Sequence, residues 1–557
     1  MSIMVHLLRK KIRGKTYLYL AHSVRINGKS RKAWQIYLGP EDKLKKVISF
    51  KTLDNVECET FEFGIEAAML DVANQIGLVD IIDRHSNKKR NQNLTVGEYI
   101  LLAAINRCAA PCSKARLGDW FKRTILSRHI PVDPEILDSQ TCWNHFSYLD
   151  DEAINEIELE LSRSILDKFK LSLDVILHDP TNFYTYVGDH DGNELPRKGH
   201  SKDQKHALNL VNLSLFCVRD FGVPLMHDVY PGNEPDAKHF KGAIGAFVER
   251  MQQLHADVRS ITLVFDKGNH SQEAFDTINA AGVHFVASLR PSTQKDLLDI
   301  PLDKFTTVKL KSNGKEVRYY KVVRKIHGVE RPVFVVFDPR HFKRCRLYLE
   351  RKIQSALDAV DEYFKERLNV KKWRDRDKVE QKIAKLLGKK LYNKLIHVDV
   401  TDDGDGNLSY KLTVDADAVK SEEARMGKTI LFTSHVDWDG EAVIRTYREQ
   451  AIIENVFRAM KSPHAISIRP VYHHVDHSIR LHAFICVLSY LLLSLTRLRL
   501  VRRGLPLGLG MLLSTLRDIR VTRLSLPGVD KAHYKLNVLS GLSGRVYKAL
   551  NLKRYLR

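Results

Sequence analysis

The order of apolar and polar residues divides the first part of the chain into a β segment and a helical segment. Residues 16–26 (TYLYLAHSVRI) and 32–39 (KAWQIYLG) are rich in aromatic and β-branched side chains, and Asn27-Gly28 between them is a strong turn signal. This combination predicts a β-hairpin. Residues 61–170 instead repeat apolar side chains every three or four positions, which predicts a helical domain.

From residue 171 onward the pattern changes to apolar runs of strand length. The runs at 174–179, 207–218 and 223–230 follow one another with no helical stretch between them, as antiparallel strands do. Later runs alternate with helical stretches at 237–254 and 271–282. Antiparallel strands followed by alternating helices and strands predict an α/β fold with a sheet of mixed direction.

A further change separates residues 301–430 from this α/β pattern. A strand-like stretch turns at Asn313-Gly314, and residues 341–400 are mostly helix-like, with 17 basic and 9 acidic side chains. We therefore expect a mostly β insertion that carries basic helices. The longest apolar stretch, Leu481 to Leu495, is shorter than the ~20 residues of a membrane span, so we expect a buried core helix there and no membrane partner.

These changes of pattern predict an organisation into several parts, as the length of 557 residues requires. Domains of about 150 residues would give three or four such parts. The expected segments are an N-terminal basic β-hairpin (1–60), a helical domain (61–170), a first part of the α/β core (171–300), a β-rich insertion (301–430), a second part of the core (431–500) and a C-terminal helical tail (501–557).

The charge balance indicates the kind of molecule that the protein binds. The 89 Lys and Arg exceed the 67 Asp and Glu, which gives a net charge of +22. Such an excess favours a polyanionic partner, most often nucleic acid, although general solubility is the alternative. Residues 1–40 contain nine cations and no acid, so we expect the hairpin to bind DNA phosphates; a solvated basic edge is the other interpretation. The nine are Arg9, Lys10, Lys11, Arg13, Lys15, Arg25, Lys29, Arg31 and Lys32.

The seven cysteines indicate a reducing compartment. Their number is odd, and they are scattered without the paired spacing of a zinc finger. The first residues, MSIMVHLLRKK, lack the apolar core of a signal peptide. We therefore expect a cytoplasmic protein.

Two apolar runs end in a carboxylate, and these ends are the first candidate chemistry. The run DVILHD ends at Asp179, and ITLVFD ends at Asp266. A bare carboxylate at the end of a buried strand is either a helix cap or a ligand for a charged group.

A third carboxylate lies in residues 447–462 (YREQAIIENVFRAMKS), which we expect to form one helix. At 100° per residue, Tyr447, Gln450, Glu454 and Lys461 fall within an arc of about 60°, next to an apolar arc. Glu454 therefore lies at the edge of a face that packs on the core. The alternative is a surface glutamate paired with Arg458 one turn later.

Two strand-end aspartates and a glutamate at the edge of a packed helix can meet at one point. Three carboxylates brought together repel one another unless cations compensate their charge. Hard divalent ions with oxygen ligands, Mg²⁺ or Mn²⁺, are suited to such a site. Two such ions about 3.5–4 Å apart promote attack on a phosphodiester.

The motifs in these segments resemble those of a large group of bacterial insertion-sequence transposases of the DDE class. Tyr447, Glu454 and Lys461 have the spacing of that group's Y-x2-R-x3-E-x6-K signature, with Gln450 in the arginine position. DPTNFY (179–184) is similar to the first-aspartate motif, and FDKGNHS (265–271) to the second. GHSKD (199–203) and GNEPD (232–236) look like the glycine-led segments between them.

The resemblance implies a catalytic core of the ribonuclease H-like fold whose two Mg²⁺ or Mn²⁺ ions are held by Asp179, Asp266 and Glu454. It also implies DNA contacts by Tyr447, Gln450 and Lys461. Gln450 departs from the family's arginine, Lys267 stands where arginine is common, and Pro180 follows the first aspartate directly.

On this resemblance we expect a transposase that binds the terminal inverted repeats of its element, cleaves there and joins the 3′ ends to target DNA. Its partner would be double-stranded DNA, with a homodimer or larger assembly holding two ends, in the bacterial cytoplasm at the nucleoid. A metal-dependent nuclease of the same fold that does not join strands is one alternative. A non-catalytic DNA-binding descendant is another, although all three carboxylates are present.

Overall fold

The computed structural model describes most of the chain. The described residues are 4–26, 29–48, 57–87, 94–188, 192–310, 314, 316–469, 471–525, 532–539 and 541–556. The chain divides into two compact units, one of residues 1–70, 113–138 and 499–557, and the other of residues 71–112 and 139–498.

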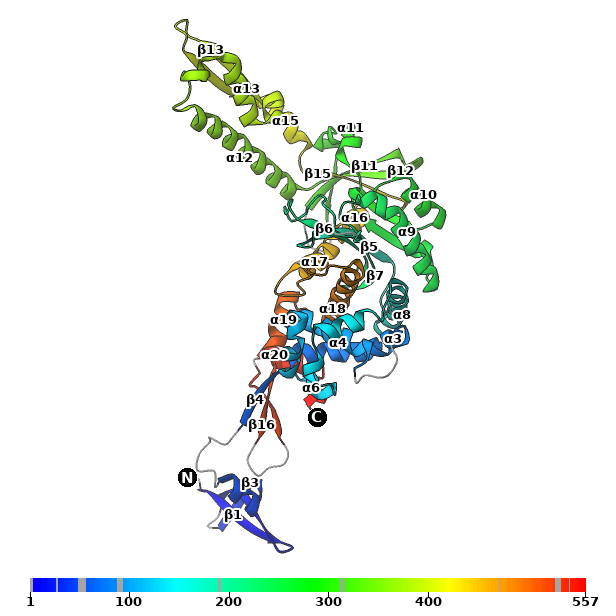
Figure 1. Ribbon diagram of the computed structural model, residues 1–557, viewed down its shortest axis with the longest axis vertical. Coiled ribbons are helices and arrows are strands. Elements are labelled where there is room, and N and C mark those ends of the chain that lie inside the picture. The colour runs from blue at the N-terminus through cyan, green and yellow to red at the C-terminus, as the bar shows by residue number, and fades with distance from the viewer. Residues whose placement is uncertain are drawn as a thin grey trace. The chain divides into compact units, whose positions relative to one another are not determined.

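A nine-stranded sheet forms the centre of the second unit (Figure 1). Its order is β10-β11-β12-β15-β9-β8-β5-β6-β7. The bounds are β5 Val175–Thr185, β6 Asn209–Val218, β7 Pro224–Pro231, β8 Thr262–Phe265, β9 His284–Ser288, β10 Thr306–Lys309, β11 Glu316–Ile326, β12 Val329–Phe337 and β15 Lys428–Thr433.

The five strands β7-β6-β5-β8-β9 make up the part of the sheet that was expected to carry the aspartates. Strand β6 is antiparallel to both of its neighbours, β5 and β7, whereas β8 is parallel to β5 and β9 is parallel to β8. This arrangement confirms the predicted α/β class, with a mixed sheet of the ribonuclease H-like kind. All ten positions of β6 are buried, which fits its largely apolar sequence, and its polar side chains Asn209, Asn212 and Ser214 are hydrogen-bonded.

Helices cover the sheet because their apolar stripes need a partner surface. Phe240 of α9 lies 4.8 Å from the His178 ring on β5, measured between ring centroids. On α8, Ser162 donates a hydrogen bond to the Leu225 carbonyl on β7. Asp150 accepts a bond from the Ala153 backbone N–H and so caps the start of α8. The bounds are α8 Asp151–Phe169, α9 Asp236–Gln253, α10 Gln272–Ala281, α11 Lys295–Leu298, α16 Gly440–Arg448, α17 Gln450–Lys461 and α18 Asp476–Arg502.

Helix α18 contains the apolar stretch that was expected to be a core helix. By length and composition it could cross a membrane, but 83% of its most apolar window is buried inside the protein. The helix therefore belongs to the core, as expected.

The segment predicted as a helical domain (61–170) is helical in the structure, but its residues are divided between the two compact units and do not form a domain of their own. Its helices are α2 Gly64–Ile76, α3 Leu78–Arg84, α4 Val96–Ala109, α5 Leu117–Lys122, α6 Leu126–His129 and α7 Ser139–Phe146, ahead of α8. A capping box starts α4, because Thr95 accepts from the Glu98 backbone while the Glu98 side chain accepts from the Thr95 backbone.

The segment predicted as a β-rich insertion is divided between the main sheet and a largely helical part. Strands β10, β11, β12 and β15 pair onto β9 and so extend the sheet. The remainder has its own hydrophobic core, which includes Val360, Phe364 and Ile383. Its elements are α12 Pro339–Phe364, α13 Arg376–Leu387, α14 Lys389–Lys394, β13 Ile396–Asp402, β14 Leu408–Val414 and α15 Ala416–Arg425. The segment therefore contains less strand than expected, because α12, α13, α14 and α15 occupy much of it.

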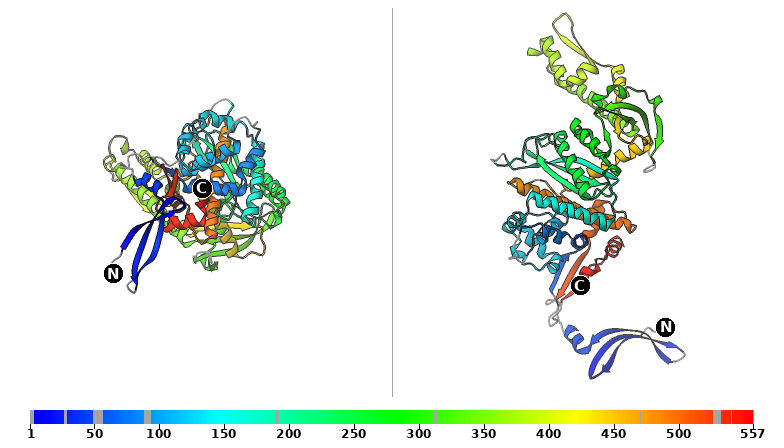
Figure 2. Two further views of the ribbon diagram at one scale, coloured as in Figure 1. Left: turned by 90° about the horizontal axis from the view of Figure 1, so that it is seen from below. Right: turned by 90° about the vertical axis from the view of Figure 1, so that its right-hand side faces the viewer.

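The N-terminal segment forms a three-stranded antiparallel sheet, which Figure 2 shows in blue as a curved ribbon. The predicted hairpin is present as β2 Lys15–Ile26 and β3 Lys29–Pro40, and its Asn27-Gly28 turn lies outside the described residues. A third strand, β1 Met4–Ile12, joins β2 through Arg13 and Gly14, which both have positive φ, as a tight hairpin turn requires. Helix α1 spans Glu41–Ile48.

The C-terminal tail is only partly helical. Strands β16 Arg520–Ser525 and β17 His533–Leu536 form a sheet with β4 Glu57–Glu62, in the order β17-β16-β4. Helices α19 Leu509–Arg517 and α20 Gly541–Ala549 flank these strands in sequence. Pairing between residues 462 positions apart, such as Thr522 with Thr60, cannot be predicted from local periodicity.

Candidate active site

The parallel pairing of β5 and β8 brings the two strand-end aspartates side by side. Leu177 pairs with Val264, and Asp179 and Asp266 each follow two residues later. Residues two apart in a strand face the same side of the sheet. The two carboxylates therefore lie on one face, on neighbouring strands, and both side chains are partly exposed.

Asp266 is held by side chains rather than used as a helix cap. Its Oδ1 accepts a hydrogen bond from the Ser288 hydroxyl at 2.5 Å and one from the Tyr447 hydroxyl at 3.2 Å. Ser288 also accepts from the Lys267 backbone N–H, which fixes the hydroxyl between strand and turn. No side-chain cap bond links Asp266 to the short helical turn that follows. The structure therefore excludes the helix-cap interpretation for Asp266 and leaves that of a ligand for a charged group.

Helix α17 packs against β5 and carries Glu454. Gln450 is buried and its amide donates to the His178 carbonyl on β5 at 2.9 Å, next to Asp179. Ile453 and Val456 are fully buried beneath the helix, whereas Glu454 is exposed. No hydrogen bond within the described part of the chain holds the Glu454 carboxylate.

The single helix expected over 447–462 is two helices. Tyr447 belongs to α16 and Gln450 begins α17, with Glu449 between them. The Glu449 N–H bonds to the Thr446 and Tyr447 carbonyls, a tight turn that redirects the chain. The DNA contact expected of Gln450 stays a prediction, and in the structure its side-chain amide donates to the β5 backbone.

The three carboxylates are close enough to influence one another. Burial raises the pKa of Asp179 to about 7, and the charges of Asp266 and Glu454 add to the rise, whereas Lys202 opposes it. Burial and the neighbouring Asp266 also raise the pKa of Tyr447, so its hydroxyl stays protonated and remains a donor. The site therefore concentrates more negative charge than its surroundings balance.

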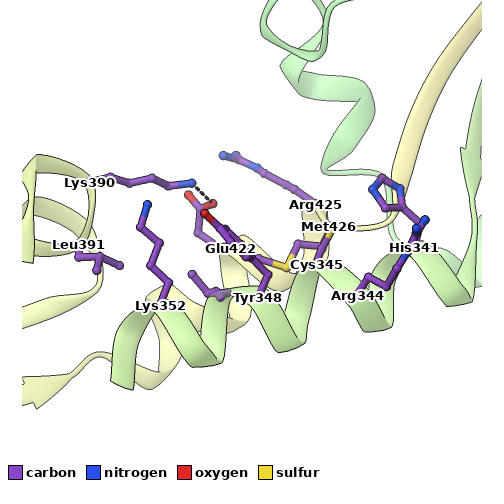
Figure 3. A pocket seen from close by; sticks show the side chains of 11 residues that line it. His341, Arg344, Cys345, Tyr348, Lys352, Lys390, Leu391, Glu422, Arg425 and Met426 are labelled. Atoms are coloured by element: carbon purple, nitrogen blue, oxygen red, sulfur yellow. Dashed lines mark ion pairs between the residues drawn. The ribbon is translucent and has the colours of Figure 1, made fainter. Parts of the chain in front are cut away.

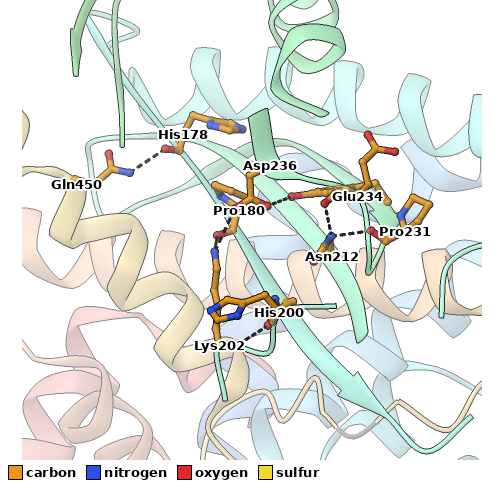
Figure 4. Close-up of polar contacts among 11 residues, drawn as sticks. His178, Pro180, His200, Lys202, Asn212, Pro231, Glu234, Asp236 and Gln450 are labelled. Atoms are coloured by element: carbon orange, nitrogen blue, oxygen red, sulfur yellow. Dashed lines mark hydrogen bonds and ion pairs between the residues drawn. The ribbon is translucent and has the colours of Figure 1, made fainter. Parts of the chain in front are cut away.

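Two buried asparagines organise the glycine-led segments beside these carboxylates. Asn182 on β5 donates to the His200 carbonyl and accepts from the Lys202 backbone N–H. Asn212 on β6 donates to the Pro231 carbonyl at 2.7 Å and the Glu234 carbonyl at 3.3 Å (Figure 4). The two asparagine side chains thus hold the GHSKD and GNEPD segments, whose only signal in the sequence was their motifs.

The two segments cross at their glycines. A Cβ on Gly199 would lie 2.1 Å from the Gly232 carbonyl oxygen, and a Cβ on Gly232 would lie 2.0 Å from the Leu210 carbonyl oxygen. Real Cβ atoms do not approach backbone oxygens so closely, so glycine is required at both positions.

The result of this crossing is a lysine placed beside Asp179. The Lys202 ammonium donates to the Pro180 carbonyl at 2.6 Å and lies 3.7 Å from an Asp236 carboxylate oxygen (Figure 4). Sequence reasoning missed Lys202 as a functional residue, although its motif was recognised. The available signal was a lysine in a polar, glycine-led segment between two strands.

The next residue, Asp203, ties the far end of α17 to the site. Its carboxylate pairs with Lys461 at 3.7 Å and with Arg469. Burial lowers the pKa of Lys461, and Asp203 opposes that effect. Lys461, expected to contact phosphate, therefore already has an anionic partner in the protein.

The donor set fits a hard divalent cation by its chemistry. Asp179, Asp266 and Glu454 supply carboxylate oxygens, and a cation among them would relieve the repulsion that raises the pKa of Asp179. Across the described ranges, however, no three His, Cys, Asp or Glu side chains are already arranged to hold a metal. Glu454, exposed and without a bond, is the member whose side chain has freedom to adjust.

The basic residues of the N-terminal sheet lie in the other compact unit. Strand register places Lys10, Lys15 and Lys32 on one face and Lys11 and Arg31 on the other, so the cations do not share a face. Arg9 is ion-paired with Glu41 at 3.0 Å. The remaining expected contacts, Arg13 and Lys29, lie at or next to the strand ends.

A second basic surface lies along α12. A pocket of about 570 Å³ is lined by Arg344, Lys352 and Lys390, with the exposed ring of Tyr348 at its wall (Figure 3). Lys390 pairs with Glu422 at 3.3 Å. Within the described residues, Arg344 and Lys352 have no ion-pair partner.

Comparison with known protein families gives a match over more than half of the chain. The family model described as "Transposase DDE domain" matches residues 171–492. The chain is similar to the piggyBac transposase synaptic complex with hairpin DNA, at 7% identity and a TM-score of 0.39, over 81% of this chain and 79% of that one. It is also similar to the Mos1 transposase paired-end complex with left transposon end, at 10% identity and a TM-score of 0.16, over 38% of this chain and 63% of that one. No curated protein sequence matches the chain.

Proposed function

Because the chain belongs to the family of transposases with a DDE domain, whose model matches residues 171–492, we propose that it mobilises a bacterial insertion sequence. In this proposal it binds the terminal inverted repeats, hydrolyses a phosphodiester bond at each element end, and directs the released 3′-hydroxyl to a phosphodiester bond of target DNA. The observation that supports it best is the in-register pair Asp179 and Asp266 with Glu454 on the helix above them.

Proteins of this family use divalent metal ions. We propose Asp179, Asp266 and Glu454 as the ligands and Mg²⁺ or Mn²⁺, as two ions, as the occupants. The chemistry that such ions supply when bound is activation of a hydroxyl nucleophile and stabilisation of the leaving oxygen.

The protein's own groups prepare the site for this reaction. Ser288 and Tyr447 both donate to one oxygen of Asp266, which holds that carboxylate in one orientation. Gln450 fixes α17 on β5, so Glu454 stays over the aspartates. Lys202, beside Asp179, is placed to balance the charge of a phosphodiester that approaches the carboxylates.

Double-stranded DNA is the proposed partner, both as element end and as target. The net charge of +22 and the unpaired cations along α12 support this, because phosphate contacts dominate DNA affinity. Two ends have to be held together, so we propose at least a homodimer on DNA, acting in the bacterial cytoplasm.

The proposal is tested with the full chain and a duplex whose end sequence comes from the DNA flanking its gene. Cleavage and joining are followed separately on gels, with pre-cleaved ends for the joining step. Asp179→Asn, Asp266→Asn and Glu454→Gln keep the side-chain shape, and each is expected to lose more than the roughly 100-fold typical of residues that only support metal ligands. Asp402→Asn, at the exposed end of β13, is the matched control.

Full activity in any one triad variant would remove that residue from the site. Cleavage without joining of pre-cleaved ends would identify a nuclease instead of a transposase.

A further inference from the structure

An aromatic surface lies at the end of β5, beyond Asp179. Tyr184 and Tyr186 lie five and seven residues after Asp179, and their ring centroids are 5.9 Å apart with the rings nearly perpendicular. Tyr472, from the segment before α18, stacks on Tyr186 with centroids 6.0 Å apart and planes at 29°. Tyr186 is 60% exposed and Tyr472 is 67% exposed. Two large rings thus form one stacked surface that faces solvent.

The backbone beneath these rings is firmly held. The Thr185 hydroxyl is buried and donates to the Val471 carbonyl at 2.7 Å, while the Val471 N–H reaches the Tyr184 carbonyl at 3.5 Å. Asn209 on β6 donates to the Val187 carbonyl at 3.1 Å. Since both tyrosine-bearing segments are anchored, their rings keep their relation to each other and to β5.

Cations connect this surface to the carboxylates. The Arg469 guanidinium lies 5.8 Å from the centroid of the Tyr184 ring and shares Asp203 with Lys461. Lys461 lies seven residues after Glu454 on α17, about 10 Å along the helix. A strand whose phosphate lies at the carboxylates can therefore continue past positive charge to the two rings.

A nucleobase is the chemical group that fits such a surface. Bases stack on exposed aromatic rings whatever their sequence, because every base has a π face, and flanking cations hold the backbone. The bases of an intact duplex are already stacked, so the rings can accept only a base that has left its pair.

We propose that Tyr186 and Tyr472 form a binding site for an unpaired base of the DNA strand that enters the active site. The distance along the backbone from Asp179 to Tyr186, the residue after the end of β5, is at most about 23 Å, which corresponds to about seven nucleotides of a B-form strand. The inference rests on the proposed function, since it places the base relative to a bond cut at the carboxylates.

The test compares affinities for duplexes that differ only in one unpaired base. The full chain is titrated, in buffer without divalent ions, with end-bearing duplexes that carry a single mismatch at each of the first eight positions on either side of the cleavage point. A mismatched base leaves its pair more easily. The wild-type chain is therefore expected to bind one or two mismatched positions more tightly than the paired duplex.

Variants assign that preference to the rings. Tyr186→Ala and Tyr472→Ala are each expected to lose roughly tenfold or more in affinity for the preferred mismatched duplex, the usual effect of removing one stacking ring. Tyr186→Phe and Tyr472→Phe keep the ring and are the matched controls, expected to bind as the wild type does. Both side chains are exposed, so unchanged thermal unfolding is expected in all four.

A second measurement does not depend on lost affinity. In Tyr472→Trp, the added indole fluorescence is expected to fall when a mismatched duplex binds and to fall less with the paired duplex.

The inference is overturned if the wild-type chain shows no preference for any mismatched position, or if both alanine variants keep that preference. Either result leaves the proposed function intact when end-bearing DNA is still cut and joined. Failure of the wild-type chain to cut such DNA would contradict the proposed function itself.

Discussion

At the scale of single residues, the candidate active site depends on polar side chains that lie within or between buried strands. Asn182 satisfies two backbone groups of the segment that presents Lys202, and Ser288 links the Asp266 carboxylate to the turn after β8. Each of these groups would be costly to bury without a partner. Their hydrogen bonds explain why polar residues occur at positions where the apolar pattern alone would favour valine or leucine.

The placement of Lys202 predicts a loss of DNA affinity and of rate on substitution. Its ammonium lies by Pro180 and Asp236 and beside Asp179, so it is available to exchange the Asp236 carboxylate for a phosphate. Lys202→Met is expected to reduce the slope of log affinity against log salt by about 0.9, the value of one phosphate contact. Lys202→Arg, which keeps the charge, is expected to retain most of that slope.

The measurement for Lys202 is end-duplex binding at a series of salt concentrations, together with cleavage rate at saturating DNA. A slope unchanged in Lys202→Met would show that the lysine serves only to hold Asp236.

Charge crowding at Asp179 predicts a pH-dependent stability in the absence of metal. Its pKa of about 7 lies above the ordinary 3.8, so the folded state favours the protonated form. The corresponding stability is present at low pH and is lost as the pH rises through about 7. Asp179→Asn cannot ionise, so at pH 8 the metal-free variant is expected to be more stable than the wild type by about 2 kcal/mol, a value reduced for partial exposure.

Denaturant unfolding at pH 4.5 and pH 8 checks this expectation, since the difference between the proteins should grow with pH. Added Mg²⁺ or Mn²⁺ is expected to stabilise the wild type at pH 8 and to have little effect on Asp179→Asn. Equal stability of both proteins at pH 8 without metal would contradict the charge argument.

At the scale of elements, register and helix docking decide which carboxylates meet. The pairing of β5 with β8 aligns the two aspartates, and the break between α16 and α17 lets Tyr447 reach Asp266 while Gln450 reaches β5. Arg448 at that break pairs with Asp338 at 2.7 Å, which joins α16 to the start of α12. Helix α12 then leads into the basic, largely helical part of the insertion.

The basic side of α12 predicts a DNA contact outside the active site. Arg344, Arg351 and Lys352 have no ion-pair partner within the described residues, and their charges border the pocket and the groove beside it. Reversing all three to Glu is expected to lower the salt slope of DNA binding by about 2 to 3, since each phosphate contact contributes about 0.9.

The control for α12 is Lys168→Glu, which reverses an exposed charge near the end of α8. Binding and thermal unfolding are measured in parallel. Loss of affinity with an unchanged salt slope would assign the effect to folding and not to phosphate contacts.

At the scale of the whole molecule, the two compact units divide the expected tasks. One contains the carboxylates, the extended sheet and the helical insertion, and the other contains the basic N-terminal sheet and the strands that join both chain ends. Cations in the N-terminal sheet occur on both of its faces. A sheet that lies between two rows of DNA phosphates would need cations on both faces, whereas a sheet that binds DNA with one face would need them only there.

The N-terminal sheet predicts a large share of the salt dependence of end binding. Replacing its cations other than Arg9, Lys10 and Arg25 by Gln removes charge without removing strands, and the salt slope is expected to fall by up to about 5. The residues replaced are Lys11, Arg13, Lys15, Lys29, Arg31 and Lys32.

Arg9→Gln is the matched control, because the charge of Arg9 is already paired with Glu41. It is expected to change the slope little. If the sixfold variant binds element ends with the wild-type slope, the sheet has another partner.

The sequence by itself determined the features that depend on neighbouring residues. An apolar run that ends in Asp179 or Asp266 marks a buried strand end, and helical spacing puts Glu454 beside an apolar stripe, because side-chain direction follows from the local backbone period. The resemblance of the spaced motifs then joined these carboxylates into one expected site. The turn signals and the excess of Lys and Arg in the first 40 residues were equally local.

The tertiary structure alone decided which distant residues meet. Strand pairing, which depends on burial and register and not on sequence spacing, aligned Asp179 with Asp266 and joined β10–β12 to the main sheet. Lys202 lies beside Asp179 because the two glycine-led segments cross so closely that neither glycine has room for a Cβ. Tyr186 and Tyr472 are 286 positions apart and form one surface because the neighbouring residues Thr185 and Val471 share a hydrogen bond. A contact between such distant residues cannot be predicted from local sequence periodicity.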